Sequence, residues 1–407
     1  MGLPEISQRP LTALQQYAIV TANYWAFTLT DGALRMLVVF HFHALGYSTL
    51  EIAFLFLFYE FFGIVTNLYG GWLGARFGLR LTLWSGTLMQ VAALLMLIPV
   101  ADTWPKWWSV AYVMVAQAIS GIAKDLNKMS AKSAIKTVAG EGQLFRWVAI
   151  LTGSKNALKG VGFFLGGVLL TALGFNQAVA VMAAGLGISF LGTLVLPADI
   201  GRMKQKPAFT ALFSTSAGIN TLALARFFLF GARDVWFVVA LPVFLEATLG
   251  WRFWEVGAFM GLWVIGYGIV QGSAPALRRT WGQRRPPNAA DLSFWTALLT
   301  AIPALIAMAL WRQVAHPAVA VVGGLVAFAV VFAMNSSIHS YLVLATSDAE
   351  AVSLNVGFYY MANAAGRLVG TLLSGALFLV GGLPLCLWAS SGLVALAWLS
   401  TQRLKTA

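Results

Sequence analysis

The stretch LGYSTLEI, residues 45–52, recurs as LGWRFWEV at residues 249–256, which lie 204 residues further along the chain. Each copy reads Leu-Gly-aromatic, with a Glu four residues after the aromatic residue. Further matches follow at offsets of 204 to 208 residues: Gly78 with Gly282, Arg80 with Arg284, Asn127 with Asn335, Lys159 with Arg367, and Gly162 with Gly370. The offset is close to half of the 407 residues, so it indicates a chain of two similar halves.

Long apolar runs dominate both halves. Hydrophobic residues make up 59% of the chain and charged residues 10%, whereas a soluble domain has about 25% charged residues. Runs of about 20 residues are long enough to cross a bilayer as helices. We therefore expect an all-α integral membrane protein of two six-helix bundles, residues 1–199 and 214–407, joined by a cytoplasmic linker at residues 200–213. The twelve transmembrane helices are expected near residues 14–42, 50–72, 79–100, 107–136, 144–173, 177–196, 217–245, 254–277, 291–311, 317–345, 351–380 and 383–399.

The 26 lysines and arginines are distributed unevenly about these spans. With the N-terminus placed in the cytoplasm, seventeen of them fall in or toward cytoplasmic segments and only Lys106, Arg252 and Arg312 in outside segments. Because positive charge is retained on the cytoplasmic side, both termini are predicted to be cytoplasmic. The formal net charge of +12 then reflects topology and attraction to membrane lipids, and we expect no nucleic-acid partner.

Six basic residues lie within the expected spans: Arg35, Lys155, Lys159, Arg226, Arg233 and Arg367. Three acidic residues share that depth: Asp31, Glu60 and Asp234. A charged side chain at the centre of a transmembrane helix costs about 3 kcal/mol, so such residues face water, a partner or a ligand. The surplus of three cations predicts a wet chamber between the halves that binds an anion.

Spacing groups several of these cations on shared helix faces. Lys155 and Lys159 are one turn apart, and Arg226 and Arg233 are seven residues apart, so each pair shares a face. We predict that all four bind substrate. The alternative for the lysines is that they reach the membrane interface or pair with Asp31 or Glu60.

A polar stripe in the eleventh span contains Tyr359, Asn363 and Arg367 at steps of four. Arg367 is the repeat-mate of Lys159, so each half would present one cation at the axis between them. A guanidinium matches a phosphate-like oxyanion with two parallel hydrogen bonds. We assign these three residues, with Arg35, to the substrate site; the alternative is a structural network of interhelical hydrogen bonds.

The acidic residues have two interpretations. Asp31 and Arg35 are four residues apart and can neutralise each other locally. Glu60 can bind a proton when buried, or it can pair with a lysine. We predict that Asp31, Glu60 and Asp234 are coupling or gating residues.

Four lysines repeat at every fourth residue toward the cytoplasmic end of the fourth span: Lys124, Lys128, Lys132 and Lys136. Such a face either binds anionic lipid headgroups or forms a vestibule that concentrates anions. We assign Lys124 and Lys128 to a cytoplasmic vestibule and keep the lipid interpretation as the alternative.

Two six-helix halves with a basic linker resemble the major facilitator architecture, in which the substrate binds between the halves near the midplane. The stretch GGWLGARFGLR, residues 70–80, is similar to the signature loop of that superfamily. Ala75 stands where the signature has an acid, and Gln117 stands where proton-coupled members have an arginine. The usual markers of proton coupling are therefore missing.

Five longer stretches resemble one branch of that superfamily, the ArsJ organoarsenical exporters. They are NYWAFTLTDGALRMLVVFHFHALGYS from Asn23, LFLFYEFFGIVTNLYGGWLGARFG from Leu55, SGIAKDLNKMSAKSAIK from Ser120, RWVAILTGSKNALKGVGFFLGG from Arg146 and ARFFLFGARDVWFVVALPVFL from Ala225. The resemblance implies export of 1-arseno-3-phosphoglycerate, which forms when a glyceraldehyde-3-phosphate dehydrogenase uses arsenate in place of phosphate. It implies arsenate resistance, a functional link to that dehydrogenase, and a location in the bacterial inner membrane.

The partners that we expect are this small anionic metabolite and membrane lipids, with the protein as a monomer. The nearest alternative substrate is another phosphorylated metabolite or an inorganic oxyanion. The alternative of another class is a membrane-embedded sensor or scaffold without transport. No enzyme activity is expected, because the chain has neither a phosphate-binding glycine loop nor a nucleophile-and-base set. Four histidines and one cysteine predict no metal site, and no cofactor is expected.

Overall fold

The computed structural model describes residues 11–47, 55–101, 103–140, 142–198, 200, 216–348 and 351–404. Every regular element in these ranges is a helix. Glu51 and Ile52 of the first repeat copy lie outside the described residues, as does all of the predicted linker except Ile200.

The described residues of the first half contain five helices: α1 (Ala13–Ala44), α3 (Leu57–Phe77), α4 (Leu79–Leu97), α5 (Lys106–Val138) and α6 (Leu144–Gly192). Gly78 separates α3 from α4 with a φ of 95°, which a side chain would strain. Pro105 precedes α5, where the first turn needs no amide donor within the helix. The backbone of α6 is non-helical at Gly174, so α6 consists of two helices joined at a kink.

The second half has the same organisation. Its elements are α7 (Ala217–Phe237), α8 (Ala240–Val243), the π-helical turn Phe244–Thr248, α9 (Phe253–Thr280), α10 (Ala289–Trp311), α11 (Pro317–Ala345) and α12 (Val352–Thr401). At the start of α10, the Asn288 side chain accepts a hydrogen bond from the Asp291 backbone amide, and the Asp291 carboxylate accepts one from the Asn288 backbone amide. Non-helical backbone at Gly381 and Gly382 divides α12 into two helices.

Within the described ranges, these elements supply the twelve predicted spans. The segment from α7 to residue 248 counts as one, and α6 and α12 count as two each because of their kinks. The kinks lie where the sequence predicts breaks, after residues 173 and 380. By length and composition, seven described helices can cross a membrane, and two of them, α6 and α12, have 49 and 50 residues. The predicted fold class of two pseudo-symmetric bundles is confirmed.

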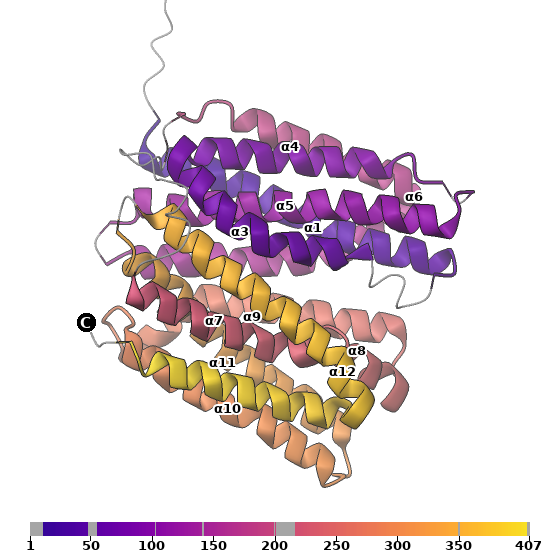
Figure 1. Cartoon of the computed structure of the whole chain (residues 1–407), viewed down its shortest axis with the longest axis vertical. Helices are drawn as coiled ribbons and strands as arrows, with labels where there is room; N and C mark the ends of the chain where they lie inside the picture. Colours follow the sequence, from indigo (N-terminus) through magenta and orange to yellow (C-terminus); the bar gives the residue numbers. More distant parts are fainter. Residues whose placement is uncertain are drawn as a thin grey trace, which may run out of the picture.

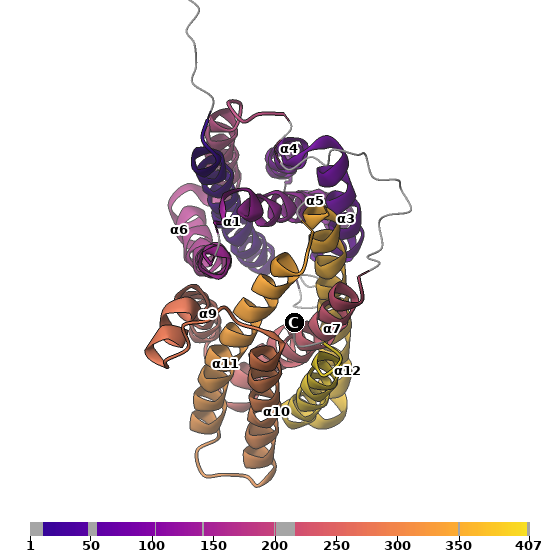
Figure 2. The same ribbon diagram turned by 90° about the vertical axis from the view of Figure 1, so that its left-hand side faces the viewer.

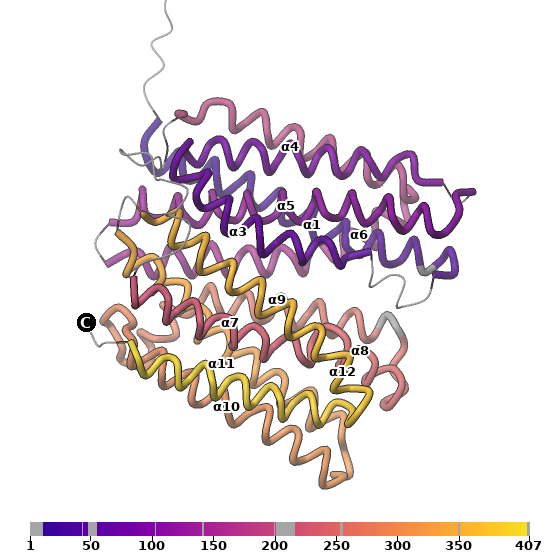
Figure 3. The backbone as a smooth tube through the Cα atoms, in the orientation of Figure 1, coloured from indigo at the N-terminus to yellow at the C-terminus, as the bar shows by residue number. Residues whose placement is uncertain are grey.

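The two halves lie side by side with their helices running in the same general direction (Figure 1). The view turned by 90° shows α1, α3, α4, α5 and α6 in one group and α7, α9, α10, α11 and α12 in the other (Figure 2). In the tube view, α12 crosses the molecule, turns at its kink and returns (Figure 3). The start of α1 and the end of α12 lie at the same end of the molecule, here called the terminal end (Figure 1).

Matching contacts reproduce the repeat in three dimensions. In the first half, Thr87 donates a hydrogen bond to the side-chain oxygen of Asn127 at 3.2 Å. In the second half, the amide of Asn335 donates to the Thr296 hydroxyl at 2.6 Å. Asn127 and Asn335 are repeat-mates in the sequence, so the duplication extends to buried side-chain contacts.

The halves are in close contact toward the terminal end. α3 packs on α12 at Gly71, where a Cβ atom would lie 2.6 Å from the Ser353 carbonyl oxygen. α6 packs on α9 at Gly268, where a Cβ atom would lie 2.7 Å from the Gly153 carbonyl oxygen. A buried apolar cluster beside these contacts combines residues of both halves. The described conformation is therefore closed at the terminal end.

We expect Gly357→Val to open this end. Gly357 lies against α3, and a Cβ atom there would be 2.7 Å from the Asn67 carbonyl oxygen, so the larger side chain forces the helices apart. Spin labels at the exposed residues Phe77 and Gln283 report the separation of the halves, and their distance should increase. Gly392→Val is the matched control, because a Cβ atom at Gly392 meets nothing within 4 Å. An unchanged label distance in the Gly357 variant would contradict the assignment of this contact as the closure.

Candidate functional site

A cavity of about 120 Å³ lies between the halves. Its lining comes from α1, α5 and α6 of the first half and from α7, α9, α11 and α12 of the second. Eight basic side chains line it: Lys124, Lys128, Lys132, Lys155, Lys159, Arg226, Arg233 and Arg367. Five of them are the cations that the sequence assigns to the substrate site between the halves.

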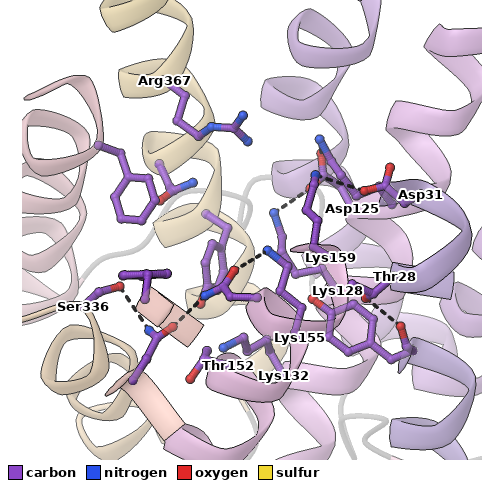
Figure 4. A pocket seen from close by; sticks show the side chains of 18 of the residues that line it. Thr28, Asp31, Asp125, Lys128, Lys132, Thr152, Lys155, Lys159, Ser336 and Arg367 are labelled. Atoms are coloured by element: carbon purple, nitrogen blue, oxygen red, sulfur yellow. Dashed lines mark hydrogen bonds and ion pairs between the residues drawn. The ribbon is translucent and has the colours of Figure 1, made fainter. Parts of the chain in front are cut away.

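The first half holds one of its lysines with an aspartate. The ammonium of Lys159 on α6 lies 3.1 Å from a carboxylate oxygen of Asp31 on α1 (Figure 4). The phenol of Tyr59 on α3 donates a hydrogen bond to the other carboxylate oxygen. Asp31 therefore pairs with Lys159, which corrects the local pairing with Arg35 that the four-residue spacing allows. The correction arises because α1 packs directly on α6.

The second half repeats this arrangement. Arg367 Nε on α12 donates to a carboxylate oxygen of Asp234 on α7 at 3.0 Å. Arg233 Nε donates to the other oxygen at 2.6 Å. Because Lys159 and Arg367 are repeat-mates, as are the helices α1 and α7, the two ion pairs are related by the pseudo-symmetry of the halves.

Glu60 connects the two halves. Its carboxylate lies 2.7 Å from Arg367 of the second half and 3.3 Å from Arg35 of the first. Lys124 lies 3.8 Å from its other oxygen. Of the two interpretations of Glu60, the structure favours the ion-pair partner, and the pair with Arg367 must break or be remade when the halves move apart.

The lysine series of α5 faces the cavity, not the lipid, at three of its four positions. Lys124, Lys128 and Lys132 line the cavity, and Lys128 forms an ion pair of 2.6 Å with Asp125. Lys136 instead donates a hydrogen bond to the Ser347 carbonyl of the second half. The lipid interpretation is therefore wrong for the first three lysines, because α5 turns this face toward α3 and α12.

Three cations of the cavity are without a carboxylate partner among the described residues: Lys132, Lys155 and Arg226. Lys155 donates a hydrogen bond to the Asn156 side chain at 3.0 Å, and Asn156 donates to Gln271 at 2.6 Å. Arg226 donates to Asn363 and to Ser336, both at 3.0 Å. Neutral polar groups thus orient these side chains without compensating their charge.

Two residues assigned to the site lie outside the lining. Tyr359 is fully buried beneath Arg226, whose guanidinium carbon is 5.3 Å from its ring centre, and Tyr360 lines the cavity in its place. Arg35 lies behind Glu60, at the edge of the ion-pair network. Tyr359 does not line the cavity as predicted, because residues spaced four apart gradually rotate around a helix that has 3.6 residues per turn.

Several neutral lining residues carry no sequence signal of their own. Gln271 on α9 and Ser336 on α11 belong to no charged or periodic pattern in the sequence, and they become site residues only through their neighbours. Lys132, by contrast, belongs to the lysine series that the sequence singles out. Its period of four could have placed Lys132 beside Lys128.

The formal charge of the network is strongly positive. Within the described residues, the eight lining cations and Arg35 face four carboxylates, those of Asp31, Asp125, Glu60 and Asp234. The excess is five positive charges, compared with the three expected from the sequence. Such a site attracts a small anion with several negative charges.

Comparisons with known proteins agree with this architecture. The sequence profile of the Major Facilitator Superfamily matches residues 18–340. A bacterial homologue of the iron transporter ferroportin, solved in an outward-facing state, is 14% identical with a TM-score of 0.73, over 95% of this chain and 98% of that one. The human organic anion transporter MFSD10 is 15% identical with a TM-score of 0.72, over 97% and 100%. The E. coli fucose:proton symporter FucP is 11% identical with a TM-score of 0.71, over 97% and 100%. No curated protein sequence matches the chain.

Proposed function

Because the chain belongs to the major facilitator superfamily, whose members carry solutes between their two halves, we propose that it exports a small anion with several negative charges. The proposed substrate is 1-arseno-3-phosphoglycerate, and its export would make the cell resistant to arsenate. The observation that carries the proposal is the excess of five positive charges around the cavity. The five stretches that resemble the ArsJ exporters support the choice of substrate.

The chemistry of this substrate matches the cavity. It has an arsenate group at one end and a phosphate group at the other, so it carries several negative charges on a short carbon chain. Lysine and arginine side chains from both halves would contact it at once, with Lys155, Lys159, Arg226, Arg233, Arg367 and Asn363 as the proposed binding residues. A ligand that neutralises cations of both halves stabilises the conformation in which the halves are close around it.

Alternating access then follows from the ion pairs. The substrate competes with Glu60 for Arg367, and with Asp31 for Lys159, so binding and release are coupled to making and breaking these pairs. Asp31, Glu60 and Asp234 are therefore proposed gating residues. We place both termini in the cytoplasm of the inner membrane, so the end at which the halves are packed together would be the cytoplasmic one. The membrane potential contributes about 2.3 kcal/mol per negative charge per 100 mV to outward movement.

The proposal predicts arsenate tolerance that depends on a second protein. An arsenate-sensitive bacterial strain is given a glyceraldehyde-3-phosphate dehydrogenase with or without this chain, and growth is measured across arsenate concentrations. Growth should extend to higher arsenate only when both proteins are present, because the dehydrogenase supplies the substrate. Tolerance with this chain alone, or no gain with both, would contradict the proposed substrate.

Another phosphorylated metabolite, or an inorganic oxyanion, remains the alternative cargo, and it is tested separately. Proteoliposomes that contain the protein are loaded with labelled 3-phosphoglycerate, phosphate or arsenate, and efflux is followed. Efflux of one of these compounds without a gain in arsenate tolerance would favour the alternative. A sensor or scaffold would show neither efflux nor a change in tolerance.

A further inference from the structure

The cations of the cavity fall into two groups. Lys159, Arg233 and Arg367 lie against carboxylates at 3.1 Å or less. Among the described residues, Lys132, Lys155 and Arg226 have none, and Lys132 and Arg226 are the most buried of the three, each only 4% exposed. Both side chains line the same cavity. Their burial therefore has no compensation in the part of the chain that the structure describes.

Such an arrangement needs a negative partner. Buried charges in proteins are paired or bound to a ligand, because removing an isolated ion from water is strongly unfavourable. Within the described part of the chain, the ammonium of Lys132 has neither a carboxylate nor a carbonyl partner, and it lies beside the phenol of Tyr360, whose ring centre is 5.9 Å away. A structural lysine would be expected to donate to a carboxylate or a carbonyl, as Lys128 and Lys136 do. Lys132 lines the cavity instead.

The Arg226 side chain is held in place by neighbours that carry no negative charge. Its Nε donates to Asn363 and its Nη1 donates to Ser336, and its guanidinium carbon lies 4.0 Å from the Phe230 ring centre. These contacts hold the plane of the guanidinium without neutralising it. These contacts do not use the N–H donors of Nη2, so that edge of the guanidinium can bind an oxyanion.

We propose that Lys132 and Arg226 form a subsite in the cavity for one tetrahedral oxyanion group, phosphate or arsenate. The inference rests on the proposed function and deepens it, because it assigns one end of a two-headed substrate to named residues. Lys132 is the cavity lysine nearest the C-terminal end of α5, so this group binds on the side of the cavity toward the terminal end. The salt-bridged cations at Lys159 and Arg367 then receive the second anionic group (Figure 4).

The test measures binding of inorganic phosphate and of arsenate to the purified full-length protein in nanodiscs of zwitterionic lipid. Thermal stabilisation and calorimetric Kd are compared for wild type, Lys132→Gln and Lys132→Arg, with potassium chloride at equal ionic strength as the blank. Lys132→Gln should weaken phosphate binding about tenfold or more, which corresponds to about 1.4 kcal/mol, and Lys132→Arg should retain most of it. Lys106→Gln removes the same charge from the other end of α5 and should bind as wild type does.

The Tm of the Lys132→Gln variant without bound anion is a second, independent test. Because the Lys132 ammonium is unpaired, its removal should raise the Tm of the anion-free protein, whereas loss of a structural lysine would lower it. Phosphate binding by Lys132→Gln equal to that of wild type, or a lower Tm or loss of folded protein in that variant, would overturn the subsite.

The outcomes separate this inference from the proposed function. Phosphate binding that depends on Lys132, in a protein that confers no arsenate tolerance, would retain the subsite and reject the substrate. Arsenate tolerance together with phosphate binding that is indifferent to Lys132 would retain the substrate and reject the subsite. If wild type binds neither phosphate nor arsenate, the subsite is rejected outright.

Discussion

Arg367→Gln is expected to abolish transport and to lower the yield of folded protein. Arg367 contacts Asp234 at 3.0 Å and Glu60 at 2.7 Å, and the Asp234 side chain is only 1% exposed. Removing one partner of a buried ion pair costs about 3–5 kcal/mol, because the remaining charge stays buried. The variant also removes a cavity cation and the ion pair between the halves. Efflux from proteoliposomes measures transport, and size-exclusion chromatography of the solubilised protein measures yield.

Comparison variants separate charge, stability and function. Arg312→Gln makes the same substitution at an exposed position after α10 and should behave as wild type. Arg367→Gln combined with Glu60→Gln should recover part of the yield without recovering transport, because the unpaired acid is then gone. Lys159→Gln, at the repeat-mate, should reduce yield less, since Lys159 pairs with the single carboxylate of Asp31. Wild-type efflux by Arg367→Gln would rule out a substrate site at this arginine.

Gly370→Leu is expected to prevent correct folding of the second half. A Cβ atom at Gly370 would lie 2.5 Å from the Gly231 carbonyl oxygen and 3.1 Å from Cβ of Asp234. Backbone atoms cannot move aside without separating α12 from α7, and overpacking of this kind costs about 1–3 kcal/mol or more. Arg226, Arg233 and Arg367 lie on these two helices, so their separation would also disperse the site. Fluorescence-detected chromatography should show aggregated protein.

Gly375→Leu is the matched control for this substitution. It lies on α12 five residues further along, and a Cβ atom there meets nothing within 4 Å. This variant should give a monodisperse peak and wild-type efflux. The repeat-mate Gly162 has the same role in the first half, where a Cβ atom would lie 2.6 Å from the Leu29 carbonyl oxygen, so Gly162→Leu should fail in the same way. Monodisperse, active Gly370→Leu would contradict the packing argument.

Most of the fold could be predicted from the sequence because the signals are local or periodic. Apolar runs determine where helices can cross a bilayer, and the glycines at 174 and 381–382 mark the two kinks. The repeat offset of 204 to 208 residues predicts the duplication that Asn127 and Asn335 reproduce with their threonine partners. The boundaries proposed for the halves and the linker remain predictions.

The site was harder to predict than the fold. The high cost of a charge in a membrane span identifies Lys155, Lys159, Arg226, Arg233 and Arg367 as inward-facing from composition alone. Composition does not determine which acid neutralises which cation, because the two partners come from different helices. Asp31 could pair with Arg35 on its own helix, yet α1 packs on α6 and brings Asp31 to Lys159.

The amino-acid sequence by itself determined the membrane-spanning class, the two-fold duplication and the surplus of positive charge at mid-span. These properties follow from transfer free energies and from periodicity, which depend on each segment separately. Only the tertiary structure decided that Glu60 joins the halves through Arg367, and that Lys132 faces the cavity without a counter-ion. Those contacts depend on how α3, α5, α7 and α12 are rotated against one another. That rotation is set by the close packing of glycines between helices that are distant in the sequence.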